Sequence, residues 1–234
     1  MLKVALLGKE YRDTIISVSG VKVGETNNCS KIINKKGGVY NFLDAEMKNL
    51  SYHIHTTGIK NAYIVSDTSQ SKRTSFVIDK NKSKLSTTEI EKINMIYDWL
   101  HISYLDDFEC YEKLVDIKIP FSVDFCTTKK REQYLEIMKK AAIIFDSRER
   151  KHLYNDIVLK APIVLHDEFG FEIITNSILT YKEMMTPLNN LNVNGAGDVY
   201  SGFFIENYVS RDIIQSARTA MKNTTKFLIH KGNI

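Results

Sequence analysis

The stretch "NVNGAGDVYSGFF", residues 192–204, is the least ordinary part of this 234-residue sequence. Two glycines flank an alanine, an aspartate follows, and small and aromatic residues continue without a break. Asn194 is a good helix N-cap residue, so Gly195, Ala196 and Gly197 are predicted to form the first turn of a helix. The early N–H groups of such a turn have no partner within the helix, and an anion can approach them closely where side chains are small or absent. The stretch therefore predicts a cradle for an anion such as phosphate.

Asp198 lies about one turn into this predicted helix, beside the anion and not in its place. A carboxylate there could accept the proton of a hydroxyl group while that hydroxyl attacks a phosphoryl group. The alternative is that the glycines only permit close packing and that Asp198 only complements the helix dipole. Two other phosphate motifs are excluded: GxxxxGK[ST] is absent, and Tyr200 occupies the third glycine position of GxGxxG.

The remaining chain alternates apolar runs of about five residues with amphipathic segments of about ten, which predicts βαβ units. The predicted strands are 2–7, 62–66, 74–79, 99–103, 120–125, 142–145 and 162–166. The predicted helices are 39–50, 87–96, 107–116, 129–139, 147–155, 195–208 and 211–229. Residues 14–35 are predicted to form a hairpin with one solvated face. The fold class predicted is therefore α/β, a mostly parallel central sheet flanked by helices, in a single domain over residues 1–234.

Composition narrows the functional class. The net charge is only +4 and the basic residues are scattered, so we expect no nucleic-acid partner. Cys29, Cys110 and Cys126 are far apart and odd in number, which indicates neither a disulfide framework nor a CxxC metal site and favours a cytoplasmic setting. The N-terminal apolar run is too short for a signal peptide and no window is long enough to span a membrane, so we expect no membrane partner.

The GAGD motif, followed by a hydrophobic residue, an aromatic residue and a Gly-Phe pair, resembles the C-terminal signature of the PfkB, or ribokinase-like, carbohydrate kinases. Further similarities follow in order along the chain. "VALLGKEYRD" resembles the first strand of that family and its loop, in which an aspartate binds sugar hydroxyls and matches Asp13. "VGETNNCSKIINKKGGVYN" resembles a lid strand and the di-glycine motif that holds substrate, which places Gly37, Gly38 and Asn41 in the substrate site. "RTSFVID", residues 73–79, is similar to a second lid strand.

Two more segments resemble the nucleotide side of the family's site. The family's Asn-x-x-Glu motif, associated with magnesium and phosphate, aligns with Asp146-Ser147-Arg148-Glu149. The resemblance thus implies that Asp146 and Glu149 organise Mg²⁺, through water, and lie near the nucleotide phosphates. "VLHDEFG", residues 164–170, falls where the family has a Thr-x-Gly-x-x-Gly loop that touches the phosphates, which places Gly170 there.

The resemblance implies an ATP-dependent phosphotransferase, with ATP and Mg²⁺, that acts on a hydroxyl of a sugar or a sugar-like small molecule. Asp198 would be the general base and Gly195, Ala196 and Gly197 the anion hole. A small β lid, from about 14–35 and 73–79, would close over the substrate. The same lid strands suggest a homodimer. A nucleoside or vitamin kinase of the same fold is an alternative.

The sequence departs from the family's pattern at several places. Asn192 and Val193 replace the Asp-Thr pair before GAGD, and Leu165 and Asp167 replace the threonine and first glycine of the phosphate loop. Between Asp44 and the "TTG" that follows, no counterpart is found of a strand and helix with a Gly-x-Asp-x-x-Gly pattern, so about one βα unit is expected to be missing. These departures leave open a second hypothesis, a protein that binds sugar or nucleotide in a regulatory role without catalysis.

Overall fold

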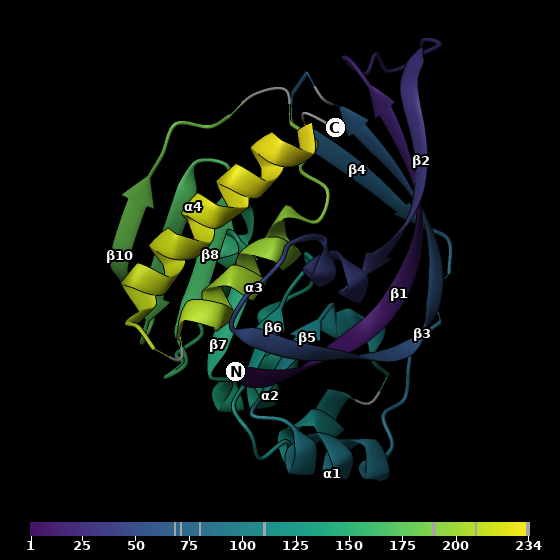
Figure 1. Cartoon of the computed structure of the whole chain (residues 1–234). Coiled ribbons are helices and arrows are strands. Elements are labelled where there is room, and N and C mark those ends of the chain that lie inside the picture. Colours follow the sequence, from purple (N-terminus) through teal and green to yellow (C-terminus); the bar gives the residue numbers. More distant parts are fainter. Residues whose placement is uncertain are drawn as a thin grey trace.

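The computed structural model describes residues 1–67, 69–70, 72–79, 81–109, 111–188, 191–208 and 210–232, so Cys110 lies outside the described residues. The described chain forms one ten-stranded sheet with helices on both faces (Figure 1). The strands are β1 Leu2–Val18, β2 Cys29–Gly38, β3 Leu50–Asp67, β4 Lys72–Val77, β5 Trp99–Ser103, β6 Phe121–Asp124, β7 Ile143–Ser147, β8 Ile163–Asp167, β9 Gly170–Thr175 and β10 Ile178–Met184.

The strand order is β10-β9-β8-β7-β6-β5-β1-β3-β4, with β2 paired to β1. The strands from β3 through β1, β5, β6 and β7 to β8 run parallel, and antiparallel strands are added at both edges. The predicted fold class, a mostly parallel α/β sheet, is confirmed. The carboxyl ends of the parallel strands meet at one edge of such a sheet, which is where ligands bind in open α/β folds.

Alternating residues of the central strands enter two different hydrophobic cores. Ala5 and Leu7 of β1 belong to one cluster, while Val4 and Leu6 of the same strand belong to the other. The first core is covered by α1 Thr87–Ile96 and α2 Leu135–Lys140, and the second by α3 Ala196–Tyr208 and α4 Ile213–Gly232. Figure 1 shows α3 and α4 side by side on their face of the sheet. No helix among the described residues is long and apolar enough to cross a membrane.

The helix predictions hold for α1, α3 and α4 but are wrong in type or length elsewhere. Helix α1 begins with a capping box, in which the Glu89 N–H donates to Ser86 Oγ and the Ser86 N–H donates to the Glu89 carboxylate. The other predicted helices are replaced, wholly or in part, by 3-10 turns, which are Val39–Asp44, Leu105–Asp107, Tyr111–Asp116, Arg131–Tyr134 and Arg148–Tyr154. The last of these buries only Tyr154, so it lacks the apolar face whose packing stabilises a longer helix.

Strands β1 and β3 are much longer than predicted. β1 continues through Gly8, with a register shift between Gly8 and Glu10, and pairs in parallel with β3 from Leu2 opposite Leu50 to Val18 opposite Asp67. The expected loss of a whole βα unit is therefore wrong in part, because residues 50–55 supply a strand. What the segment between Asp44 and this strand lacks is a helix.

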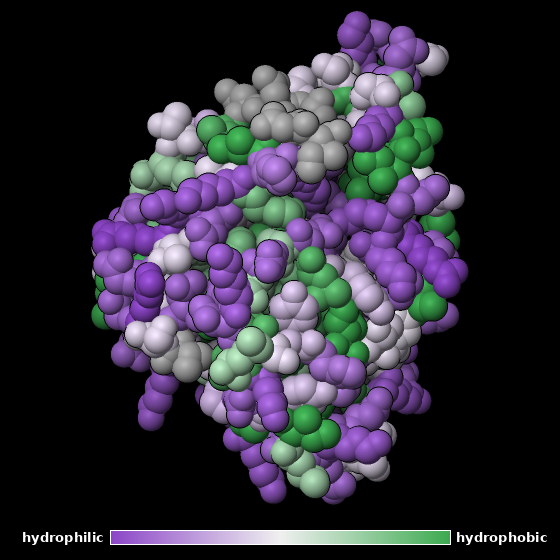
Figure 2. Space-filling model, viewed as in Figure 1, coloured by the Kyte–Doolittle hydropathy of each residue, from purple (hydrophilic) through white to green (hydrophobic). Residues whose placement is uncertain are grey.

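The distal parts of β1 and β3, together with β2 and β4, extend beyond the central sheet. We call this four-stranded extension the lid sheet, and the predicted lid segments 14–35 and 73–79 lie largely within it. Its outer face carries apolar side chains at the surface, since Ile32, Phe76 and Ile78 are 60%, 57% and 58% exposed. Figure 2 shows hydrophobic side chains gathered over this part of the molecule.

Candidate active site

The GAGD segment forms the start of α3, one residue later than predicted. Ala196 is the first helical residue, and the first full helical hydrogen bond runs from Val199 N to Gly195 O at 3.1 Å. Gly195 has a φ of 80°, which favours glycine, and the side chain of Asn41 lies about 3.1 Å from the point where a Cβ would be. The N–H groups of Gly197 and Asp198 have no carbonyl partner within the helix and are available to an anion.

The residues that depart from the family pattern hold the turn before α3. Asn192 Oδ1 accepts the N–H of Asn194 at 3.1 Å, and the Val193 carbonyl accepts the N–H of Ala196 at 3.1 Å. From α4, Lys231 Nζ donates to the Asn194 carbonyl at 2.8 Å. The prediction that Asn194 caps the helix is therefore wrong. Asn194 instead lies in a turn that hydrogen bonds hold from both sides.

Asp198 is a buried carboxylate that accepts two hydrogen bonds. It is 5% exposed, and its Oδ2 accepts hydrogen bonds from Asn41 Nδ2 at 3.1 Å and from the Tyr104 hydroxyl at 3.3 Å. Burial raises the pKa of Asp198 to about 6, although Arg73, Asn41 and Tyr104 act in the opposite direction. A carboxyl group with this pKa is ionised at neutral pH yet basic enough to accept a proton, which is the property of a general base.

A cavity of about 200 Å³ lies on the inner face of the lid sheet, lined in part by the two side chains that donate to Asp198, and we call it the lid-side cavity. Tyr11, Asp13, Gly38, Asn41 and Tyr104 are among the residues that line it. The structure thus brings three of the four predicted substrate residues, Asp13, Gly38 and Asn41, to one cavity. The rings of Tyr11 and Tyr104 lie 5.6 Å apart, and the hydroxyl of Tyr11 is held by a hydrogen bond to an aspartate, Asp107, at 2.8 Å.

The fourth predicted substrate residue, Gly37, affects the cavity through the side chain of Asp13, which packs against it. A Cβ on Gly37 would overlap the carboxylate of Asp13, which is 3% exposed. Burial raises the pKa of Asp13, and Lys35 and Arg73 oppose the shift. Gly38 has a φ of 63° and a Cβ there would overlap the Lys9 carbonyl, so the backbone requires glycine at 38, whereas glycine at 37 leaves room for the Asp13 carboxylate.

A second cavity, of about 430 Å³, lies on the other side of the α3 N-terminus, and we call it the helix-side cavity. Ala196, Gly197, His166 and Glu149 line one part of it. Its lining also includes the apolar side chains of Met185, Leu188, Leu191, Met221 and Leu228. Burial lowers the pKa of His166 to about 3, so its ring, stacked on Tyr200 at 4.2 Å, is neutral. An elongated ligand with one apolar end and one anionic end fits this lining.

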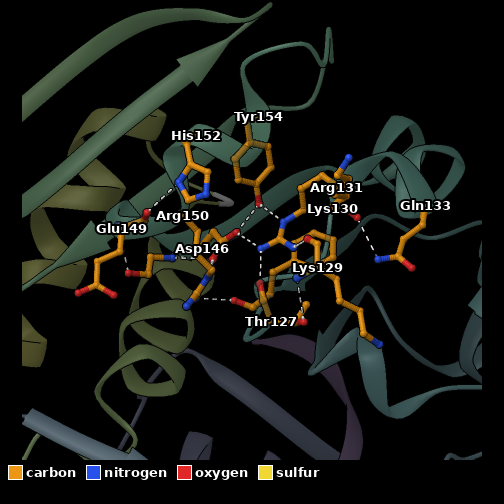
Figure 3. Close-up of polar contacts among 12 residues, drawn as sticks. Thr127, Lys129, Lys130, Arg131, Gln133, Asp146, Glu149, Arg150, His152 and Tyr154 are labelled. Carbon is orange, nitrogen blue, oxygen red and sulfur yellow. Dashed lines mark hydrogen bonds and ion pairs between the residues drawn. The ribbon is translucent and has the colours of Figure 1, made fainter.

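The carboxylate of Asp146 is bound by arginine side chains of the protein itself, as Figure 3 shows. Its Oδ2 accepts from Arg131 Nη2 at 2.7 Å and from the Tyr154 hydroxyl at 2.5 Å, and its Oδ1 accepts from Arg150 Nε at 2.5 Å and from the Ser147 N–H at 2.8 Å. The side chains of Asp146 and Arg131 are fully buried. The structure therefore does not support the predicted magnesium role of Asp146, because both of its oxygens are already taken.

Glu149 is placed differently from Asp146. Its side chain points away from the arginine cluster in Figure 3, is exposed, and lines the helix-side cavity. A carboxylate in this position fits a hydrated Mg²⁺, which usually keeps several waters and takes one or two carboxylates. No group of three or more metal-binding side chains is found among the described residues.

The predicted phosphate loop, residues 164–170, is instead a hairpin between β8 and β9. Gly170 pairs with Asp167 across the hairpin, and a Cβ on Gly170 would overlap the Glu183 carbonyl of β10. Gly170 is not among the residues that line the helix-side cavity, so its predicted contact with phosphate finds no support. The carboxylate of Asp167, which does line the cavity, is paired with Arg148 at 2.8 Å and is thereby neutralised.

Sequence reasoning missed several residues of the site. Tyr104 and Asp124 follow or end the parallel strands β5 and β6, and this position at the carboxyl edge of a sheet was the available signal. Burial, together with the charges of Asp198 and Asp146, raises the pKa of Asp124 to about 8. Arg73 of β4 lines both cavities, and no local signal marks it.

This architecture is shared with several solved structures, although the sequence itself matches little. No family model and no curated protein matches the sequence. Among solved structures, a microbiome-derived acarbose kinase aligns with 96% of this chain and 91% of its own, at 13% identity and a TM-score of 0.71. Arabidopsis thaliana ribokinase, complexed with ribose and ATP, aligns with 94% of this chain and 90% of its own, at 10% identity and a TM-score of 0.66. Cryptococcus neoformans ribokinase, in complex with ADP, covers 94% and 91%, at 13% identity and a TM-score of 0.70.

The chain has the ribokinase-like fold. The resemblance that the sequence motifs indicated is confirmed at the level of the fold. Within this ribokinase-like fold, the lid-side and helix-side cavities share Arg73 as a lining residue, and Arg73 bonds to Asn194 just before α3. At 10–13% identity the likeness establishes the fold, and the argument for an activity rests on the site itself.

Proposed function

We propose that this protein is an ATP-dependent phosphotransferase that phosphorylates a hydroxyl group of a sugar or a sugar-like small molecule. The observation that carries the proposal is the position of Asp198. This buried carboxylate, with its pKa raised to about 6, directly follows Ala196 and Gly197 of the helix-side cavity. It accepts hydrogen bonds from Asn41 and Tyr104 of the lid-side cavity. That arrangement supports a general base and an anion hole between an acceptor and a phosphoryl donor.

In the proposed reaction the acceptor occupies the lid-side cavity, with Asp13 and Asn41 as hydrogen-bonding groups. The acceptor oxygen forms a bond to the γ-phosphorus of ATP while the bond from that phosphorus to the bridging oxygen breaks. The bridging oxygen leaves with the electron pair as part of ADP, and the acceptor proton passes to Asp198 Oδ1 or Oδ2. The N–H groups at the start of α3 receive the charge of the transferring phosphoryl group.

The helix-side cavity supports a nucleotide as donor. Its apolar part suits a base and its other part reaches Gly197, so the phosphates would point toward the helix N-terminus. Mg²⁺, when bound with the nucleotide, would supply neutralisation of phosphate charge, and Glu149 is the carboxylate placed to hold it through water. The ribokinases with ATP and with ADP support the choice of nucleotide.

The lid-side cavity supports a polyhydroxylated acceptor. A carboxylate, an amide and two tyrosine rings line a space of about 200 Å³, which is on the scale of one monosaccharide. Sugars are bound by this combination of hydrogen-bonding groups and flat apolar surfaces. The acarbose and ribose named with the related structures belong to the same chemical class.

The test is to incubate the protein with MgATP and a panel of sugars, amino sugars, sugar phosphates and nucleosides, and to measure ADP. We expect ADP formation that depends on one class of acceptor and is saturable in its concentration. Saturable heat of binding without ADP would instead favour a regulatory binding protein. Turnover with a nucleoside and none with sugars would favour a nucleoside kinase of the same fold.

Substitution of Gly37 tests the placement of Asp13. A Gly37→Ala side chain would displace the Asp13 carboxylate, so we expect KM for the acceptor to rise by about tenfold or more, the value of one charged hydrogen bond, with a smaller change in KM for ATP. Lys31→Ala is the control, because Lys31 is an exposed residue of the same strand and does not line the lid-side cavity. Equal kinetics for both variants would contradict the assignment of Asp13 to the acceptor.

We also propose that the lid sheets of two chains pair in a homodimer, because the outer lid face exposes Ile32, Phe76 and Ile78. Light scattering coupled to size exclusion is expected to give twice the mass of one chain. Phe76→Lys should yield a single-chain mass, whereas Met95→Lys, on the surface of α1, should leave the dimer intact. A single-chain mass for the unmodified protein would contradict the proposal.

A further inference from the structure

We propose that Arg73 of the lid strand β4 is a catalytic residue that binds the transferring phosphoryl group, so that the lid sheet supplies part of the catalytic centre. The inference rests on the proposed function and adds to it a residue from the lid. It means that a closed lid would be required for the phosphoryl transfer step itself as well as for acceptor binding.

The register of β4 directs Arg73 inward. β4 runs antiparallel to β3, with Val77 opposite Ala62, Ser75 opposite Ile64 and Arg73 opposite Ser66. Alternate residues of a strand share a face, so Arg73, Ser75 and Val77 lie on one side of β4. All three line the lid-side cavity, which identifies this side as the inner face of the lid sheet.

Arg73 is the residue that the two cavities share. It lines the lid-side cavity, where it is the one cation among the described lining residues, and it also lines the helix-side cavity beside Ala196 and Gly197. A phosphoryl group passing from a donor in one cavity to an acceptor in the other must cross this junction. Arg73 is therefore positioned at the point where negative charge develops.

The guanidinium of Arg73 is held at the α3 turn by a neutral partner. Arg73 Nη1 donates to the amide oxygen of Asn194 at 2.6 Å, and Arg73 forms no ion pair in the described part of the chain. Its charge nevertheless acts on the surrounding carboxyl groups and favours the ionised forms of Asp13, Asp124 and Asp198. An arginine with no carboxylate partner retains its fork of N–H donors for a phosphate.

The chemical role follows from the charge of the transition state. As the acceptor oxygen bonds to the γ-phosphorus and the bond to the bridging oxygen of ADP breaks, negative charge spreads over the three equatorial oxygens. The arginine fork would donate to two of these oxygens, while the α3 N–H groups receive the same group from the helix side. The proton still passes to Asp198, so Arg73 changes no protonation state in the step.

The test compares Arg73→Ala and Arg73→Lys with the unmodified protein in the ADP assay. We expect Arg73→Ala to lower kcat by about a thousandfold, in the range of other arginines that stabilise phosphoryl transfer, with KM for the acceptor changed by less than about tenfold. Arg73→Lys should recover only part of this loss, and added guanidinium should partly restore Arg73→Ala. Arg12→Ala, an exposed arginine of β1 in the lid sheet, is the matched control and should retain full activity.

A binding measurement keeps this test separate from the test of the proposed function. We expect Arg73→Ala to bind the non-hydrolysable β,γ-methylene analogue of ATP at least about tenfold more weakly than the unmodified protein, and to bind AMP equally well. If the unmodified protein forms no ADP with any acceptor but this difference is found, the proposed function fails and the phosphate contact of Arg73 stands. Unchanged kcat, or equal binding of the analogue by both proteins, would overturn the role of Arg73.

Discussion

The Asp198→Asn variant is expected to lose about a thousandfold in kcat while remaining folded and still binding ATP and acceptor. Asparagine has nearly the same shape as aspartate, and its amide oxygen can accept the hydrogen bonds from Asn41 and Tyr104. It cannot accept the acceptor proton, so the loss expected is that of a general base, about 10²–10⁴ in rate. The measurement is the ADP assay together with calorimetric binding of both ligands.

The pH dependence of kcat/KM is a second measurement of the role of Asp198. Asp198 must be ionised to act as a base, so kcat/KM of the unmodified protein should fall about tenfold for each pH unit below its pKa of about 6. A folded-state pKa of about 6 against an ordinary value of 3.8 means that the folded protein binds this proton more tightly than the unfolded chain. The contribution of Asp198 to stability is therefore present below pH 4 and lost as the pH rises through 6.

Removal of the charge should consequently stabilise the fold at neutral pH. We expect Asp198→Asn to raise the free energy of unfolding at pH 7.5 by on the order of 1–3 kcal/mol, and to have little effect at pH 4. Thermal unfolding at the two pH values measures this difference. Full turnover in the variant would contradict the assignment of Asp198 as the base, and a large loss of stability at pH 7.5 would show that Asp198 is a structural residue.

The second large effect is expected on the stability of an Asp146 variant, and it distinguishes a structural role of Asp146 from a role in binding Mg²⁺. Asp146→Ala leaves the buried guanidinium of Arg131 and the partly buried one of Arg150 without their carboxylate. Uncompensated buried charge typically costs 3–5 kcal/mol, so we expect a loss of about that size in the free energy of unfolding. Urea denaturation followed by circular dichroism measures it.

Glu149→Ala is the matched control for Asp146→Ala, because Glu149 is the exposed carboxylate three residues further along the chain. We expect its stability to change by less than about 0.5 kcal/mol, as is usual for surface substitutions, while the concentration of Mg²⁺ needed for half-maximal activity rises. The opposite pattern, with a stable Asp146→Ala variant that needs more Mg²⁺, would restore the magnesium role that the sequence motif implies for Asp146.

Much of the fold could be predicted because the strong patterns are local. Five-residue apolar runs identify the buried parallel strands β5 to β8, and the capping box identifies α1. The 3-10 turns could not be predicted, because segments such as Arg148–Tyr154 have helical composition and lack only the buried face that tertiary packing provides. The hairpin of β9 and β10 was also missed, although its turn at Asn176 and Ser177 uses two residues with positive φ.

The residues of the candidate site also differ in whether the sequence could predict them. Asp198 could be proposed from the local sequence because it directly follows a Gly-Ala-Gly run at a predicted helix start, whereas Gly37 and Gly38 could be proposed only from their resemblance to the family's di-glycine motif. Asp146 could not be interpreted from its motif, because its partners Arg131 and Arg150 are ordinary basic residues until the chain folds around them. Arg73 could not be found at all, since only the pairing of β4 with β3 brings it to the start of α3.

The central claim is that this protein transfers the γ-phosphoryl group of ATP to a small hydroxylated acceptor. ³¹P NMR of a mixture of protein, MgATP and the acceptor that gives most ADP tests it directly. The account predicts a new phosphomonoester resonance that grows in equal amount with the resonances of ADP, and no such signal with Asp198→Asn. Inorganic phosphate in place of the phosphomonoester, or no change in the ATP resonances with any acceptor, would contradict it.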